Sequence, residues 1–103
     1  MSTLKVGGQW TVAGTATQLT TALGLKESVW LRSLSIKNAA GAANSLYVGK
    51  ANVTASPANA HVELAAGESF DWFSSVGNLI NTDEIYMIGT ANAANIAFIT
   101  GMS

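Results

Sequence analysis

Apolar and polar residues alternate in short runs along this sequence, which is the pattern of β-strands with one buried face. In the clearest run, Leu34 and Ile36 share one face of a predicted strand, and serines occupy the other face. After residues 38–44, which are small and polar, a second run places Leu46 and Val48 on one face. We expect these two strands to form an antiparallel hairpin.

The loop of this hairpin exceeds a two-residue turn, and Gly41 in its middle is expected to supply a positive φ. Strict alternation in the preceding strand puts Arg32 on the same face as Leu34 and Ile36, so a charge would be buried. Either Arg32 packs its stem at the edge of the core with its head in water, or a bulge resets the register. We favour the first interpretation.

The remaining strands are also short. Behind the second strand we expect at most one helical turn, because Thr20 and Thr21 favour extended structure while Gly24 is placed as a helix stop. Gly67 is expected to turn the chain between two later strands. The predicted strands cover residues 9–13, 17–19, 29–37, 45–49, 61–64, 69–73, 84–89 and 95–101.

The last two predicted strands surround a loop of Ala and Asn, as the first hairpin does, and they are apolar on both sides. One face of each belongs to the core. The other face needs a cover, which could be a second sheet, the N-terminal segment or a neighbouring subunit.

Seven or eight short strands, with turn residues roughly every eight to twelve positions and little helix, predict an all-β fold. We expect an antiparallel, jelly-roll-like β-sandwich, with a small closed barrel as the alternative. Residues 1–8 are expected to form a flexible N-terminal arm, or more simply a frayed end, and residues 9–103 a single β-sandwich domain. The residues expected to be mostly buried are Leu34, Ile36, Leu46, Val48, Phe70, Trp72, Ile85, Met87, Ile96 and Phe98.

Composition indicates a protein that works inside an assembly. Hydrophobic residues make up 49% of the 103 positions and charged residues only 11%, well under half of the usual quarter. Because charge normally keeps a surface dispersed, we expect another protein to cover much of this one. The five basic residues are scattered and the net charge is -1, which argues against nucleic acid as a partner.

The sequence also disfavours several other classes of protein. The sequence has no Cys, so disulfides, thiolate metal sites and thiol nucleophiles are excluded. No stretch approaches the roughly 18 apolar residues of a membrane span, and the first ten residues lack the apolar run of a signal peptide. We expect a soluble protein that is not exported and does not bind a membrane.

His61 and Glu63 are the best candidates for chemistry, since two positions apart on a strand they would point the same way. No third group completes a metal or catalytic set, so the structural interpretation is preferred. Two further acidic pairs, Asp83 with Glu84 and Glu68 with Asp71, lack the spacing of matched carboxylates and are expected to be solvated turn residues. We therefore predict no enzyme, no cofactor, and no catalytic, cofactor-binding or metal-binding residues.

The three tryptophans, Trp10, Trp30 and Trp72, could form a platform on which sugars stack. Each also falls on a face predicted to point inward, and large aromatic residues on alternating strands usually belong to a core. The core interpretation is preferred.

The order of segments resembles small β-sandwich virion proteins of tailed bacteriophages, most closely a head decoration (cement) protein. The similarity runs from about Gly14 to the end and is carried by GTATQL, RSLSIKN, NSLYVGKANVT, ELAAGESF and EIYMIGTANAANIAFITG. It implies a subunit made in the host cytoplasm that binds the major capsid protein on the outer surface of the head. The scarcity of charge and the two-sided apolar strands near the C-terminus also predict that the subunit associates with itself, as a homotrimer or homodimer, across the junctions between major capsid protein subunits. The alternative is a tail- or fibre-associated module that binds carbohydrate for host adhesion.

Overall fold

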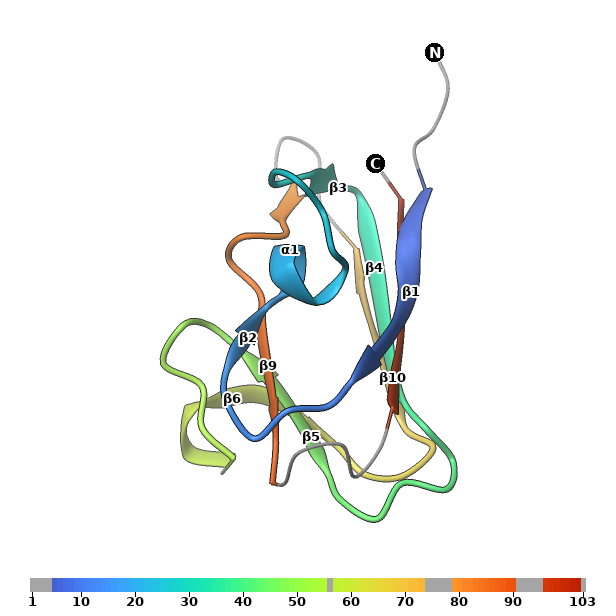
Figure 1. The fold of residues 1–103 in the computed structure, drawn as a ribbon, viewed down its shortest axis with the longest axis vertical. Helices are drawn as coiled ribbons and strands as arrows, with labels where there is room; N and C mark the ends of the chain where they lie inside the picture. The colour runs from blue at the N-terminus through green and yellow to red at the C-terminus, as the bar shows by residue number, and fades with distance from the viewer. Residues whose placement is uncertain (1–4, 56, 74–78, 91–95, 103) are drawn as a thin grey trace.

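Two antiparallel four-stranded sheets face each other in the computed structural model, which describes residues 5–55, 57–73, 79–90 and 96–102 (Figure 1). Sheet A contains, in spatial order, β1 (Lys5–Thr11), β10 (Ile96–Met102), β4 (Ser33–Asn38) and β7 (Ser69–Phe73). Sheet B contains β2 (Thr17–Gln18), β9 (Tyr86–Gly89), β5 (Leu46–Gly49) and β6 (Ala60–Leu64). The remaining described elements are a two-stranded ladder of β3 (Trp30–Leu31) and β8 (Ile80–Asn81), the helix α1 (Leu19–Ala22) and the 3-10 helix η1 (Pro57–Asn59).

The predicted all-β, antiparallel sandwich is confirmed. The strand number differs from the prediction, because the described residues contain ten strands, of which β3 and β8 are two-residue pieces outside both main sheets. Apolar side chains from the inner faces fill the space between the sheets. The main core consists of Trp10, Val12, Leu19, Leu31, Leu34, Ile36, Leu46, Val48, Leu64, Met87, Ala97 and Ile99.

Half of the residues predicted as buried lie fully inside: Leu34, Ile36, Leu46, Val48 and Met87. Trp72 and Ile85 are half-buried and pack against the core. The prediction is wrong for Phe70, Ile96 and Phe98, which are exposed.

The error at β10 has a packing cause. Ala97 and Ile99 face the core instead of Ile96 and Phe98, and Ala97 is paired with Trp10 of β1. Both residues of that pair are buried on the inner face, so the small Ala97 side chain leaves room for the indole. Hydrophobicity alone would bury the face that carries Ile96 and Phe98. The fit between the small Ala97 side chain and the Trp10 indole instead determines which face of β10 is buried.

The predicted hairpin of the 30–49 segment does not form. β4 belongs to sheet A, where it pairs with β10 and β7, while β5 belongs to sheet B, where it pairs with β9 and β6. The last two strands, β9 and β10, likewise lie in different sheets. Connections of this length can cross the roughly 10 Å between packed sheets, so alternation locates strands without identifying their partners.

The second interpretation of Arg32 fits the structure better than the preferred one. Arg32 lies exposed between β3 and β4, as expected for its charge, but Leu31 and Leu34 are both fully buried. Two residues three apart cannot share a face of a regular strand, so the alternation is reset at Arg32. The same reset turns Trp30 outward, against the prediction, with 52% of its surface exposed.

The predicted glycine turns are partly confirmed. Gly24 has a φ of 68° directly after α1, and the bonds Gly24 N–H to Thr21 O and Leu25 N–H to Thr20 O, each 3.0 Å, complete a Schellman motif. Gly67 has a φ of 79° in the turn before β7. Gly41 is not among the described glycines with positive φ, so that expectation is wrong.

The first strand begins earlier than predicted. Residues Lys5 to Gly8, expected in a flexible arm, belong to β1 and pair with β10, with Lys5 opposite Met102 and Gly8 opposite Ile99. Residues 1–4 of the expected arm lie outside the described residues.

The outer face of sheet B has its own small apolar cluster. Tyr47 of β5 and Ile88 of β9 are buried there against Val53, which comes from the connection between β5 and η1. A loop of the chain itself therefore covers the second apolar side of β9. On β10, in contrast, the second apolar side remains exposed.

Candidate functional site

A β-bulge separates His61 from Glu63. On β6, Val62 pairs with Val48 and Ala60 pairs with Gly49, which leaves His61 without a partner on β5. A bulge of this kind re-aims side chains. His61 turns toward the rings of Phe70 and Trp72, at centroid distances of 6.0 and 6.3 Å. The prediction that His61 and Glu63 point the same way is therefore wrong.

Glu63 lies on the outer face of sheet B. Its Oε2 accepts a 2.8 Å hydrogen bond from the hydroxyl of Tyr47, its partner across the strand pair. This bond, together with burial and the nearby negative charge, raises the pKa of Tyr47 above its ordinary value. The pair joins two neighbouring strands of sheet B.

The other predicted carboxylates are exposed, and two of them accept hydrogen bonds. Glu68 Oε1 accepts a 2.7 Å bond from Ala65 N–H, and Asp83 Oδ1 accepts a 2.5 Å bond from the Thr20 hydroxyl. Asp71 lies on the outer face of sheet A, paired with Ser35. Within the described residues, no group of three or more His, Asp or Glu side chains could hold a metal ion.

The three tryptophans do not form one platform. Trp10 is in the core, Trp30 is exposed on β3, and Trp72 of β7 is half-buried. The predicted inward orientation holds for Trp10 and Trp72, and it is wrong for Trp30.

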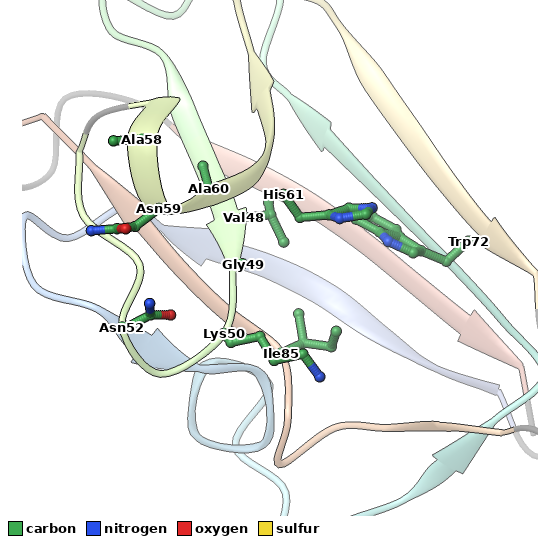
Figure 2. Close-up of a pocket in the computed structure, with 10 residues that line it drawn as sticks. All are labelled: Val48, Gly49, Lys50, Asn52, Ala58, Asn59, Ala60, His61, Trp72 and Ile85. Atoms are coloured by element: carbon green, nitrogen blue, oxygen red, sulfur yellow. The ribbon is translucent and has the colours of Figure 1, made fainter.

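The described part of the chain contains a cleft of about 470 Å³ between the edges of the two sheets, which we call the β6–β7 cleft (Figure 2). Trp72 from sheet A and His61 from sheet B extend toward one another on one side of it. Lys50, Asn52 and Asn59 lie on the other side, on the loop that connects β5 to β6 and in η1. Val48 and Ile85 provide apolar lining.

The outer face of sheet A is the second notable surface. Phe73, Phe98 and Ile96 project from it with 78%, 41% and 37% of their surfaces exposed. Two shallow hollows of about 470 and 320 Å³ lie beside Thr100, one against Phe98 and the other against Phe73. The small polar side chains between the aromatic residues are Ser33, Ser35, Ser69 and Thr100.

Sequence reasoning found the residues of the cleft without finding the cleft. His61 was a candidate for an acid/base or metal pair, and Trp72 for a sugar-stacking platform. The sequence signals for the bulge are Gly49, which lies opposite Ala60, and the turn-forming residues 49–60. These signals do not indicate the direction in which the His61 side chain points. Phe98 and Phe73 were missed as surface residues. The signal for Phe98 was the apolar character of both sides of β10.

No protein-family model matches this chain, and no curated protein matches it. No helix in the described residues is long and apolar enough to span a membrane.

Proposed function

We propose that this chain is a structural protein of a tailed-bacteriophage virion, a decoration or cement protein that binds the outer surface of the head. It would stabilise the junctions between major capsid protein subunits. The observation that carries this proposal is the outer face of sheet A, a four-stranded surface with exposed aromatic residues and little charge.

The composition of this face suits contact with another protein. Among its described side chains, Lys37 and Asp71 carry the charges, and the rest are apolar or uncharged polar groups, including Gln9 opposite Phe98. Phe73 and Phe98 are aromatic groups of the kind that dominate binding energy when they enter pockets of a partner. Serines between them would leave hollows that a partner's side chains can fill.

The strand order supports a finer fold assignment, and we infer that the sandwich is a jelly roll. With β3 and β8 set aside, the sheets read first-last-third-sixth and second-seventh-fourth-fifth in chain order. Successive strands thus alternate between the sheets, except in the middle, where β5 and β6 are neighbours. Two Greek keys wound together give this order, and the jelly roll recurs in viral capsid and lectin domains.

The stabilising effect would come from repetition. An interface of standard size buries about 1,200 to 2,000 Å², and modest contacts at many equivalent junctions add up over a shell. We propose that the subunit associates with itself as a trimer or dimer on the head surface, after synthesis in the host cytoplasm. No chemical reaction is part of this function, and His61→Ala with Glu63→Ala should leave head binding unchanged.

Binding to heads assembled without this protein tests the proposal. The double variant Phe73→Ser/Phe98→Ser should reduce head occupancy at least tenfold, because it removes two exposed aromatic anchors from the outer face of sheet A. Leu79→Ser is the control, since Leu79 is a large apolar residue with 47% of its surface exposed, close to the 41% of Phe98, but it lies outside both main sheets, immediately before β8. Cryo-electron microscopy should place the bound density on the head lattice.

Two outcomes would contradict the proposal. Density confined to the tail would exclude the cement role. Full head occupancy by the double variant, with Leu79→Ser behaving the same way, would show that the outer face of sheet A is not the docking surface.

A further inference from the structure

The β6–β7 cleft has the features of a ligand site that the proposed capsid role does not use. It opens between the edges of the two sheets and not on the outer face of sheet A. Its volume of about 470 Å³ lies within the range of about 300 to 1,000 Å³ that is usual for small-ligand sites. Both surfaces could therefore be occupied at once.

An aromatic cluster forms one side of the cleft. The ring of Phe70 lies 4.6 Å from that of Trp72, and the His61 ring lies 6.3 Å from the same indole at an interplanar angle of 33°. Phe70 and His61 thus fix the orientation of Trp72, while the half-buried indole keeps a surface toward the cleft. A preoriented aromatic ring of this kind offers a flat apolar surface at low conformational cost.

The local backbone is shaped to keep these groups in place. The bulge at His61 directs the imidazole toward Trp72. Opposite the bulge, Gly49 approaches the loop so closely that an added Cβ would lie 3.0 Å from Asn59 O and 3.1 Å from Val53 Cγ2. The glycine therefore permits the loop that carries Lys50 and Asn52 to close against η1.

The opposite side of the cleft is polar and carries a positive charge. Asn52 presents an amide, which can donate and accept hydrogen bonds as a sugar hydroxyl requires. Lys50 adds an ammonium group, and no carboxylate is among the lining residues. An aromatic surface, an amide and a cation match a ligand with an apolar ring face, hydroxyl groups and a negative charge.

We propose that the β6–β7 cleft binds one or two residues of an acidic saccharide, with the sugar ring on Trp72 and its carboxylate near Lys50. The amide of Asn52 contacts the hydroxyl groups. This site is independent of the capsid-binding face, so it stands or falls separately from the proposed function.

Titration with digalacturonate, followed by ¹H–¹⁵N chemical shifts, tests the proposal, and galactobiose serves as the neutral matched probe. The shifts should concentrate at Lys50, Asn52, Asn59, His61 and the indole N–H of Trp72. Lys50→Gln should weaken digalacturonate binding about two- to fivefold, the loss expected for one exposed ion pair, and leave galactobiose unaffected. Trp72→Ala should weaken both probes at least tenfold.

Trp30→Ala is the control, because Trp30 is an exposed tryptophan outside the cleft, and it should bind digalacturonate as the unmodified protein does. Since Trp72→Ala also touches the core, Asn52→Ala provides a second variant at an exposed residue, and it should weaken binding while the spectrum remains that of a folded protein. No binding of digalacturonate at millimolar concentration would overturn the proposal. Equal binding of the two probes, or shifts that cluster around Trp30, would overturn it as well.

Discussion

Asn38 in sheet A and Leu64 in sheet B are joined directly by a 3.0 Å hydrogen bond from the Asn38 side-chain amide to the Leu64 carbonyl. The same amide nitrogen donates to the carbonyl of Asn44 at 2.9 Å, so both of its protons are used. Asn38 is fully buried. One side chain thus ties the two layers together at the end of β4.

Replacement of Asn38 should therefore be costly. Asn38→Ala leaves two carbonyls without these donors and should lower the free energy of unfolding by about 1–3 kcal/mol. Asn38→Asp should cost more, because a carboxylate cannot donate and would face both carbonyl oxygens. Urea denaturation measures both effects. Asn52→Ala, at an exposed asparagine, is the control and should stay within about 0.5 kcal/mol; an equally small effect at Asn38 would contradict the role assigned to it.

Alkaline pH should weaken the fold through Tyr47. The hydrogen bond to Glu63, burial and the nearby carboxylate raise the pKa of Tyr47, whose ordinary value is about 10. The folded protein therefore holds this proton more tightly than the unfolded chain does. The resulting stabilisation is complete below pH about 10 and is lost as the pH rises through the folded pKa.

Denaturation midpoints between pH about 8 and 11 check this expectation. The unmodified protein should lose more stability over this interval than Tyr47→Phe, which has no phenol to ionise at this position. Glu63→Gln keeps an acceptor but removes the charge, so the Tyr47 pKa should fall toward its ordinary value. An identical alkaline loss in Tyr47→Phe would mean that another group causes it.

The sequence predicted the positions of the strands well because burial of one face imposes a period of two. β7 at Ser69–Phe73 and the short α1 behind β2 appear as expected, and Gly24 ends the helix with a positive φ. Strand partners could not be predicted, since pairing of β4 with β10 depends on packing between segments far apart in the chain. The alternation of apolar and polar residues shows which face of a strand is buried, but it does not show which other strand, near or far in the sequence, pairs with it.

The candidate surfaces escaped prediction for local reasons. The face of β10 was set by the fit of Ala97 beside Trp10, which hydrophobicity does not reveal. The β6–β7 cleft depends on a bulge at His61. One extra residue in a strand reverses the direction of a side chain, and the composition of the segment does not reveal it. Both features are visible only when neighbouring strands are known.

Thr82 should be a second buried polar anchor. Its hydroxyl oxygen accepts a 3.0 Å bond from Val29 N–H and lies 2.7 Å from the hydroxyl of Thr20 in α1. Thr82→Val keeps the shape but leaves these groups without their partner, so the free energy of unfolding should fall by about 1–3 kcal/mol. Thr82→Ser retains the hydroxyl and should recover most of the loss in thermal or urea denaturation. Equal stability of the Val and Ser variants would show that packing, and not hydrogen bonding, sets the requirement.

Gly7 should be required for the pairing of β1 with β10, and Gly7→Ala tests this. A Cβ added at Gly7 would overlap the carbonyl oxygen of Ile99, which is backbone of the neighbouring strand and cannot move aside as a flexible side chain can. The substitution should therefore displace β1 and lower the free energy of unfolding by about 1–3 kcal/mol. Gly41→Ala is the matched control, because no atom lies within 4 Å of the added Cβ, and it should change stability by less than about 0.5 kcal/mol. Hydrogen exchange at the β1 amides locates the effect: faster exchange confined to β1 in Gly7→Ala is expected, whereas unchanged exchange and stability would show that the strand accommodates a side chain there.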